Sequence, residues 1–79
     1  MSDHAMTGPA DRLVRMANQI AAFFKSGGEA AAVAGTADHI AKFWDPRMRK
    51  QLMAHLAAGG SGLDPVALKA AEALRQRAA

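Results

Sequence analysis

The side chains that could act in acid–base or metal chemistry are few and scattered. The chain has three histidines and neither cysteine nor tyrosine. His39 follows Asp38 directly, but neighbours in a helix point about 100° apart, so the two cannot face one substrate together. His39 and His55 could bind a metal with Asp38, yet none of the spacings typical of zinc sites is present. We therefore predict no catalytic residue and no metal ligand in this chain.

A glycine-rich run occupies positions 59–62, where the sequence reads Gly-Gly-Ser-Gly. A phosphate-binding loop needs a strand before it and a lysine after it, and this run has neither. The three serines lie near the N-terminus or beside glycines, so none has the surroundings of an activated nucleophile. We predict that the run stops one helix and makes a flexible turn.

Aromatic and basic side chains gather between Phe43 and Gln51. Adjacent aromatic residues of a helix diverge by about 100°, so Phe43 and Trp44 cannot both be central in a small core. Phe23 and Phe24 pose the same problem. One member of each pair is therefore free to face a partner, and aromatic and arginine side chains are the commonest interface anchors. The alternative is that Trp44 fills the core and the cations form a solvated face.

The same segment has the features of a nucleic-acid recognition helix. A helix that begins at Pro46 follows a short turn and places cations near its start, where they would reach base edges. The net charge of +3 is slight, and the three cations spread around the helix. A helix-turn-helix nucleic-acid binder stays open as the alternative function, with these residues in contact with nucleic acid: Arg47, Arg49, Lys50 and Gln51.

Four helices must position these side chains. Asp45-Pro46 and Asp64-Pro65 each read as an N-cap followed by proline at the first helical position. No alternating run indicates a strand, so the predicted fold class is all-α, a small bundle of three to four short helices. Residues 1–8 are predicted to be a disordered leader before a single helical domain over 9–79. The predicted helices span about 9–25, 29–43, 46–58 and 65–77.

Helical periodicity predicts which sides of these helices are buried. In the first helix, an arc of about 120° contains Leu13, Met16, Ala17, Ile20, Phe23 and Phe24, and polar residues, among them Asn18, lie opposite. Gly35 inside the second helix costs about 1 kcal/mol relative to alanine, so either the chain tolerates that cost or a neighbouring backbone needs the space. The large apolar residues of the fourth helix diverge, which suggests a helix that holds only when docked.

The composition indicates that this chain needs a partner. Hydrophobic residues make up 51% of it, but twenty are alanines, so the core has few large side chains. So thin a core roughly offsets the conformational entropy lost on folding, and disulfides are excluded because cysteine is absent. We expect no membrane partner, because no stretch approaches the roughly 20 apolar residues that span a bilayer and no signal-peptide pattern is present. The expected location is the cytoplasm.

Two segments carry a resemblance to a known family. The run 12–21 reads RLVRMANQIA and is followed by Phe23-Phe24. The run 37–49 contains ADHI and then FWDPRMR. In this order they resemble the delta subunit of NAD-dependent, molybdenum-containing formate dehydrogenase, over roughly 13–74.

This resemblance implies an accessory subunit, without a cofactor of its own, in a cytoplasmic complex that oxidises formate to carbon dioxide and reduces NAD. The partner subunits are then expected to carry molybdenum bis-pterin, iron–sulfur clusters and FMN, and the expected partner is the large molybdenum subunit. No catalytic residue is implied, and both a permanent subunit and an assembly chaperone stay open. Asp45 and Asp64 are the predicted helix caps, and the predicted partner-binding residues are His39, Phe43, Trp44, Arg47, Met48 and Arg49.

Overall fold

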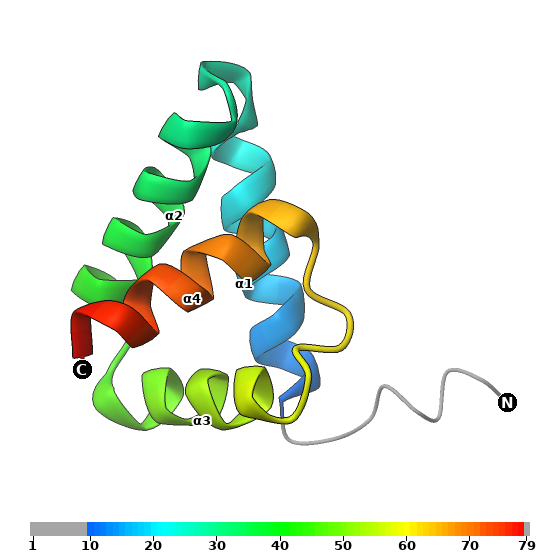
Figure 1. Cartoon of the computed structure of the whole chain (residues 1–79), viewed down its shortest axis with the longest axis vertical. Coiled ribbons are helices and arrows are strands. Elements are labelled where there is room, and N and C mark those ends of the chain that lie inside the picture. Colours follow the sequence, from blue (N-terminus) through cyan, green and yellow to red (C-terminus); the bar gives the residue numbers. More distant parts are fainter. Residues whose placement is uncertain (1–9, 79) are drawn as a thin grey trace, which may run out of the picture.

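The protein, seen in a computed structural model that describes residues 10–78, consists of four α-helices and short connections (Figure 1). The helices are α1 (Asp11–Phe24), α2 (Glu29–Phe43), α3 (Pro46–Ala57) and α4 (Pro65–Ala78), and a 3-10 turn, η2 (Lys25–Gly27), joins α1 to α2. The predicted all-α class is confirmed, and the predicted helix bounds agree to within two residues where the structure describes them. The predicted leader, residues 1–8, lies outside the described residues.

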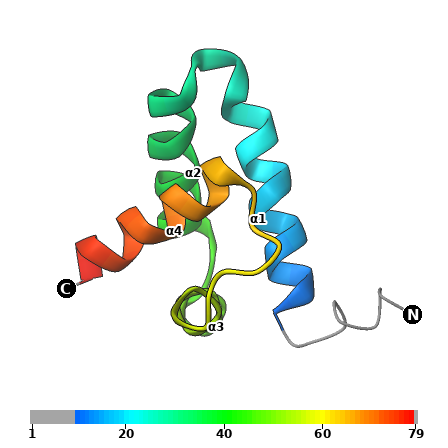
Figure 2. The ribbon, with the colours of Figure 1, turned by 45° about the vertical axis from the view of Figure 1, so that its right-hand side comes forward.

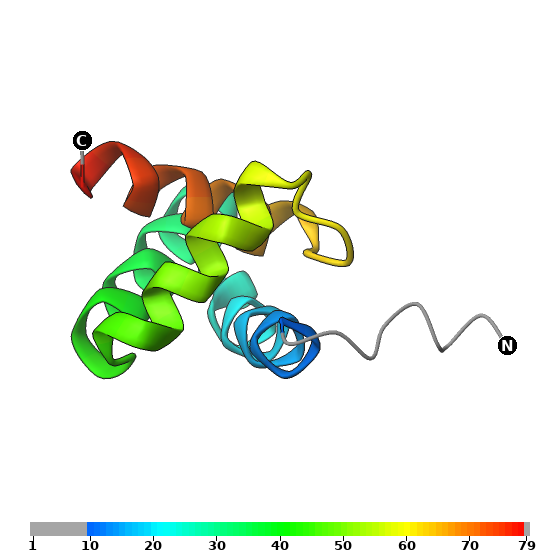
Figure 3. The ribbon, with the colours of Figure 1, turned by 90° about the horizontal axis from the view of Figure 1, so that it is seen from below.

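The helices form a hairpin that is covered on one face and at one end. α1 and α2 are its two arms, and α4 crosses them and packs against both (Figures 1 and 2). α3 runs across the open end of the hairpin, as the view from below shows (Figure 3). α3 packs mainly against α4 and also against α1. No helix in residues 10–78 is long and apolar enough to span a membrane.

Both predicted aspartate caps are present. Asp45 Oδ1 accepts a hydrogen bond from the Met48 backbone N–H at 2.9 Å, and Pro46 occupies the first position of α3. Asp64 Oδ1 accepts from the Ala67 backbone N–H at 2.8 Å in the same way. These bonds satisfy backbone donors that the first turn of a helix leaves without partners.

Alanine makes up nearly half of the core. Among residues 10–78, fifteen hydrophobic residues are buried, and seven of them are alanines. α4 illustrates the consequence, because its large residues do diverge as the sequence suggests, but its buried face is an alanine stripe. The close approach that alanine permits lets α4 pack on the other helices of this chain, which agrees with the prediction that this helix holds only when docked. Its buried residues are Val66, Ala67, Ala70, Ala71 and Leu74.

Gly35 gives room to an aromatic ring, not to a neighbouring backbone. A Cβ on residue 35 would lie 2.7 Å from Cδ1 and 2.9 Å from Cε1 of Phe24. Such distances are far below van der Waals contact, so the ring of Phe24 packs directly on the α2 backbone. Gly35 therefore lowers the helix propensity of α2, but its missing side chain allows the close contact between α1 and α2.

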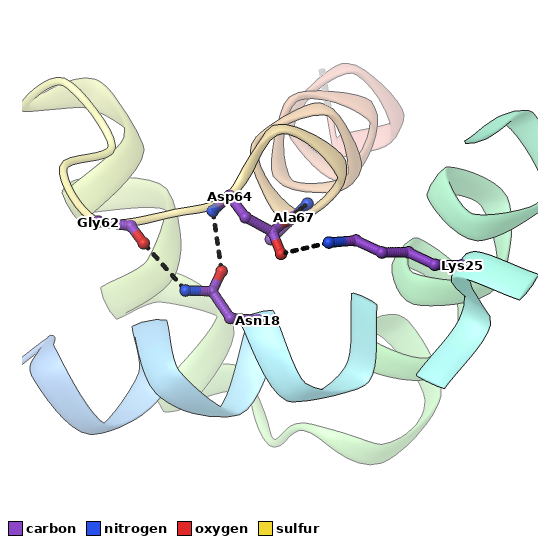
Figure 4. Close-up of polar contacts among 5 residues, drawn as sticks. All are labelled: Asn18, Lys25, Gly62, Asp64 and Ala67. Atoms are coloured by element: carbon purple, nitrogen blue, oxygen red, sulfur yellow. Dashed lines mark hydrogen bonds and ion pairs between the residues drawn. The ribbon is translucent and has the colours of Figure 1, made fainter. Parts of the chain in front are cut away.

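A polar bridge holds the start of α4 on α1 (Figure 4). Asn18 Nδ2 donates to the Gly62 carbonyl oxygen at 2.9 Å, and Asn18 Oδ1 accepts from the Asp64 backbone N–H at 2.9 Å. Lys25 Nζ lies 3.3 Å from Asp64 Oδ2, so the capping carboxylate also pairs with η2. Asn18 thus lies on the α4 side of α1.

A second pair joins the beginning of α2 to α4. The Nζ of Lys69 donates a hydrogen bond to Oε2 of Glu29, and the two exposed side chains form an ion pair. The hydrogen bond and the charge of Lys69 lower the pKa of Glu29 below its ordinary value. The same hydrogen bond and the charge of Glu29 raise the pKa of Lys69. The pair therefore favours the charged form of both groups in the folded chain.

Candidate functional site

An apolar groove lies between α1 and α2 and is lined mostly by large side chains of α1. Its volume is about 430 Å³. α1 supplies most of its wall, and His39 of α2 and Trp44 complete it. The apolar character of the wall suits the binding of apolar side chains more than of a charged metabolite. Its lining residues are Met16, Gln19, Ile20, Phe23, Phe24, His39 and Trp44.

The groove opens on the side of the hairpin opposite to α4. Met16 and Ile20 are each two residues from Asn18, so each points about 160° away from it around α1. Asn18 contacts the loop before α4. The two large apolar residues therefore lie on the other face of the hairpin, where no helix within residues 10–78 covers them.

Only part of the apolar arc predicted for α1 is buried in the core. The buried residues of α1 are Leu13, Val14, Ala17 and Ala21, whereas Met16 and Ile20 of the predicted arc are half-buried. Small residues decide which side of α1 is buried. Ala17 and Ala21 allow the neighbouring helices to approach closely, so the side of α1 that carries them faces the core. The larger side chains of the arc are left at the groove.

The two aromatic pairs divide as predicted, with one member inside and one outside. Trp44 is 4% exposed and Phe43 is 72% exposed. Phe24 is half-buried on Gly35, and Phe23 is 78% exposed. Exposed phenylalanines of this degree are costly to leave in water. Phe23 lies near the turn between the arms and Phe43 ends α2, so one exposed ring lies at each end of the hairpin.

Trp44 was predicted to be a partner-binding residue, and the structure shows it buried, so its contact with a partner stays a prediction. Its side chain belongs to the hydrophobic core together with Ile40 and Leu52. The chain turns at Trp44, whose backbone is extended at the C-cap of α2, and this turn directs the indole inward. Trp44 forms part of the wall of the groove, but it is not a projecting anchor.

Arg49, also predicted to bind a partner, makes contacts within the chain, and its contact with a partner stays a prediction. Its Nη1 donates to the backbone carbonyl of Trp44 and lies 3.5 Å from the carbonyl oxygen of Ala41. Both carbonyls belong to the C-terminal end of α2, which attracts cations because its carbonyls lack helical partners. Arg49 thus ties α3 to α2, and these bonds are made within the chain and not with a partner.

The other predicted docking residues differ in exposure. Arg47 is exposed, and Met48 is half-buried against the core. His39 is half-buried and packs on Phe43, with ring centroids 4.7 Å apart. His39 lines the groove and Phe43 packs on His39 without lining it, whereas Arg47 lines a separate hollow on α3. Their contacts with a partner stay predictions.

Sequence reasoning missed most of the groove. Met16 and Ile20 were assigned to the core, and Gln19 was assigned to the polar side of α1. The available signal was the spacing of small residues: Val14, Ala17 and Ala21 recur at i, i+3 and i+7 and mark a second, narrower face. Among residues 10–78, no three acidic or histidine side chains come together to hold a metal ion.

The chain was compared with known families, curated proteins and solved structures. Residues 12–71 match the family described as NADH-dependent formate dehydrogenase delta subunit FdsD. No curated protein and no solved structure matches the chain. The matched region includes α1, η2, α2, α3 and the first half of α4, and hence the whole groove. The chain belongs to the family of formate dehydrogenase delta subunits, and it is an accessory subunit of that enzyme complex.

Proposed function

We propose that this chain is a non-catalytic, cytoplasmic delta subunit that docks on the large molybdenum-containing subunit of a NAD-dependent formate dehydrogenase. In this role it stabilises the complex or assists its assembly. The observation that carries the proposal is the α1–α2 groove, whose apolar wall is flanked by the exposed rings of Phe23 and Phe43. Apolar surface of this kind on a small protein indicates a protein interface.

We propose a docking surface that differs from the one predicted from the sequence. The predicted docking region centred on positions 43–49, but Trp44 and Arg49 serve the fold itself. His39 remains from that region and lines the groove with the α1 side chains, and the exposed ring of Phe43 packs on it. We therefore propose that the face of the hairpin opposite to α4 is the docking surface.

The redox cofactors are proposed to belong to the partner subunits. Molybdenum bis-pterin, iron–sulfur clusters and FMN would be held there, and this chain would contribute contacts alone. The chain has no cysteine to ligate an iron–sulfur cluster. Its effect on formate oxidation would then be indirect, through the amount of assembled enzyme.

Co-purification from the native organism tests this function. A tagged copy of this chain should recover the large molybdenum-containing subunit, and deletion of its gene should lower the yield of assembled, active complex. Recovery of the tagged chain without any formate dehydrogenase subunit would contradict the proposal. Comparing its presence in mature complex and in early assembly intermediates distinguishes a permanent subunit from an assembly chaperone.

A further inference from the structure

One end of the groove is basic. Arg12 lies one turn before Met16 on the side of α1 that also carries Gln19, and Lys42 lies one turn after His39 on α2. Arg12 is near the beginning of α1 and Lys42 near the end of α2. Because the two arms run in opposite directions, both exposed cations lie at the same end of the groove, the end near α3 (Figure 1).

Carboxylates also lie near this end, but each is engaged with another group, and Asp45, which follows α2, caps α3. Asp11 pairs with Arg15 at 2.5 Å, and Asp38 pairs with Arg77 of α4 at 3.0 Å. Glu29, at the other end of α2, pairs with Lys69. Within residues 10–78, no ion pair neutralises Arg12 or Lys42. The groove therefore changes along its length from aromatic and apolar, at Phe23, to cationic.

A helix is the element that fits such a groove. Two neighbouring helices leave a furrow into which the side chains of a third helix interdigitate. Met16 and Phe23 are seven positions apart along α1, which is about 10 Å or two helical turns. An amphipathic helix would fill it with large apolar residues at i, i+3 or i+4, and i+7.

Resting on the proposed docking function, we propose that the groove binds an amphipathic helix of the partner subunit whose one end carries carboxylates. Its apolar residues would lie along Met16, Ile20 and Phe23, and Asp or Glu side chains one turn beyond them would meet Arg12 and Lys42. Complementary charges at the rim of an interface fix orientation and steer association. The carboxylates thus set the direction in which the helix lies.

A second copy of this chain fits less well. If two copies paired groove to groove, the cationic end of one would meet either the cationic end or the Phe23 end of the other. In the described part of the chain, Asp11, Asp38 and Glu29 are each in an ion pair, and Asp45, which is in none, is engaged as the cap of α3. Like charges that face each other across an interface cost several kcal/mol. The charge pattern accordingly favours a different, acidic partner.

Binding to the formate dehydrogenase complex purified without this chain tests the charges. We expect the double variant Arg12→Gln/Lys42→Gln to associate about tenfold more weakly at low ionic strength and to lose most of the salt dependence of the native chain. Arg75→Gln, a change of an exposed cation on α4, is the matched control and should bind as the native chain does.

The outcomes separate the two proposals. If Arg12→Gln/Lys42→Gln binds like the native chain while Phe23→Ser/Phe43→Ser binds weakly, the acidic helix is contradicted and the groove stands. If neither double variant is impaired, the groove is not the docking surface. If the native chain itself does not bind, the proposed function fails, and this inference fails with it.

Photocrosslinking identifies the occupant directly. Gln19 is exposed and lines the groove, so Gln19→p-benzoylphenylalanine places a photoreactive group in it. In the assembled complex, we expect a crosslink to a helical segment of a partner subunit with apolar residues at i, i+3 or i+4, and i+7 and with Asp or Glu one turn beyond. A crosslink to a second copy of this chain, or to a segment without carboxylates, would overturn the proposal.

Discussion

The ring of Phe24 in α1 lies where residue 35 of α2 would carry a Cβ, and Gly35 makes this contact possible. The contact brings the two arms of the hairpin together near its turn. It also fixes one wall of the groove, because the same ring lines it. The fold and the docking surface therefore share this residue pair.

Gly35→Ala should destabilise the chain by about 1–2 kcal/mol, even though alanine favours helix. The added Cβ would lie 2.7 Å from Cδ1 of Phe24, so the ring or the arms must shift. Gly27→Ala is the control, since its Cβ would meet only the Ala31 Cβ at an ordinary 3.5 Å. Urea denaturation measures both, and a Gly35→Ala variant as stable as the native chain would refute the contact.

Asn18→Ala should lower the free energy of unfolding by about 1–2 kcal/mol, because two hydrogen bonds to the loop before α4 are lost. Amide hydrogen exchange in α4 should accelerate more than in α2. Gln19→Ala changes the next residue, which points into the groove, and should stay within about 0.5 kcal/mol of the native chain. Equal effects of the two changes would argue against the polar bridge.

Sequence patterns were sufficient for the elements that local signals define. The two Asp-Pro pairs predicted the starts of α3 and α4, and both caps are present. The division of each aromatic pair also followed from helical geometry alone. These features depend on residues close together in the chain, where steric and hydrogen-bonding rules decide the outcome.

The rotation of the helices could not be predicted in the same way. Which side of α1 is buried depends on how closely α2 and α4 approach it, and alanines set that distance. Asn18 looked like a solvent-facing residue, yet its amide bonds to a loop 44 residues further along the chain. Arg49 likewise found its acceptors only once α2 and α3 were placed. The groove was hidden for this reason.

The Asp45 cap at the start of α3 contributes to the free energy of unfolding. Asp45→Ala should cost about 1 kcal/mol of stability, since the Met48 backbone N–H loses its acceptor. Asp45→Asn keeps a side-chain oxygen in place and should cost little. Thermal unfolding of the two variants at one pH distinguishes a lost cap from a lost charge, and an unchanged melting temperature in Asp45→Ala would contradict the assignment.

The Glu29–Lys69 pair predicts that its contribution to the stability of the fold is lost both at low and at high pH. The pKa of Glu29 is lowered on folding, so its contribution is present above the pKa of the unfolded chain and is lost as pH falls through the folded value. The pKa of Lys69 is raised, so its contribution is lost as pH rises through its folded value. The coupling between Glu29→Gln and Lys69→Gln in a double-mutant cycle should be largest near neutral pH and should vanish in acid and alkali. A coupling independent of pH would contradict an ionic origin.

The central claim is that the groove face, with Phe23 and Phe43, docks on the formate dehydrogenase complex. Its most direct test is the affinity of purified Phe23→Ser/Phe43→Ser for the complex that lacks this chain. Both rings are mostly exposed, so the variant should keep its melting temperature and bind at least about tenfold more weakly, a loss of roughly 1.4 kcal/mol or more. Ala34→Ser, an exposed change on another side of α2, is the control. Native affinity in Phe23→Ser/Phe43→Ser would contradict the claim.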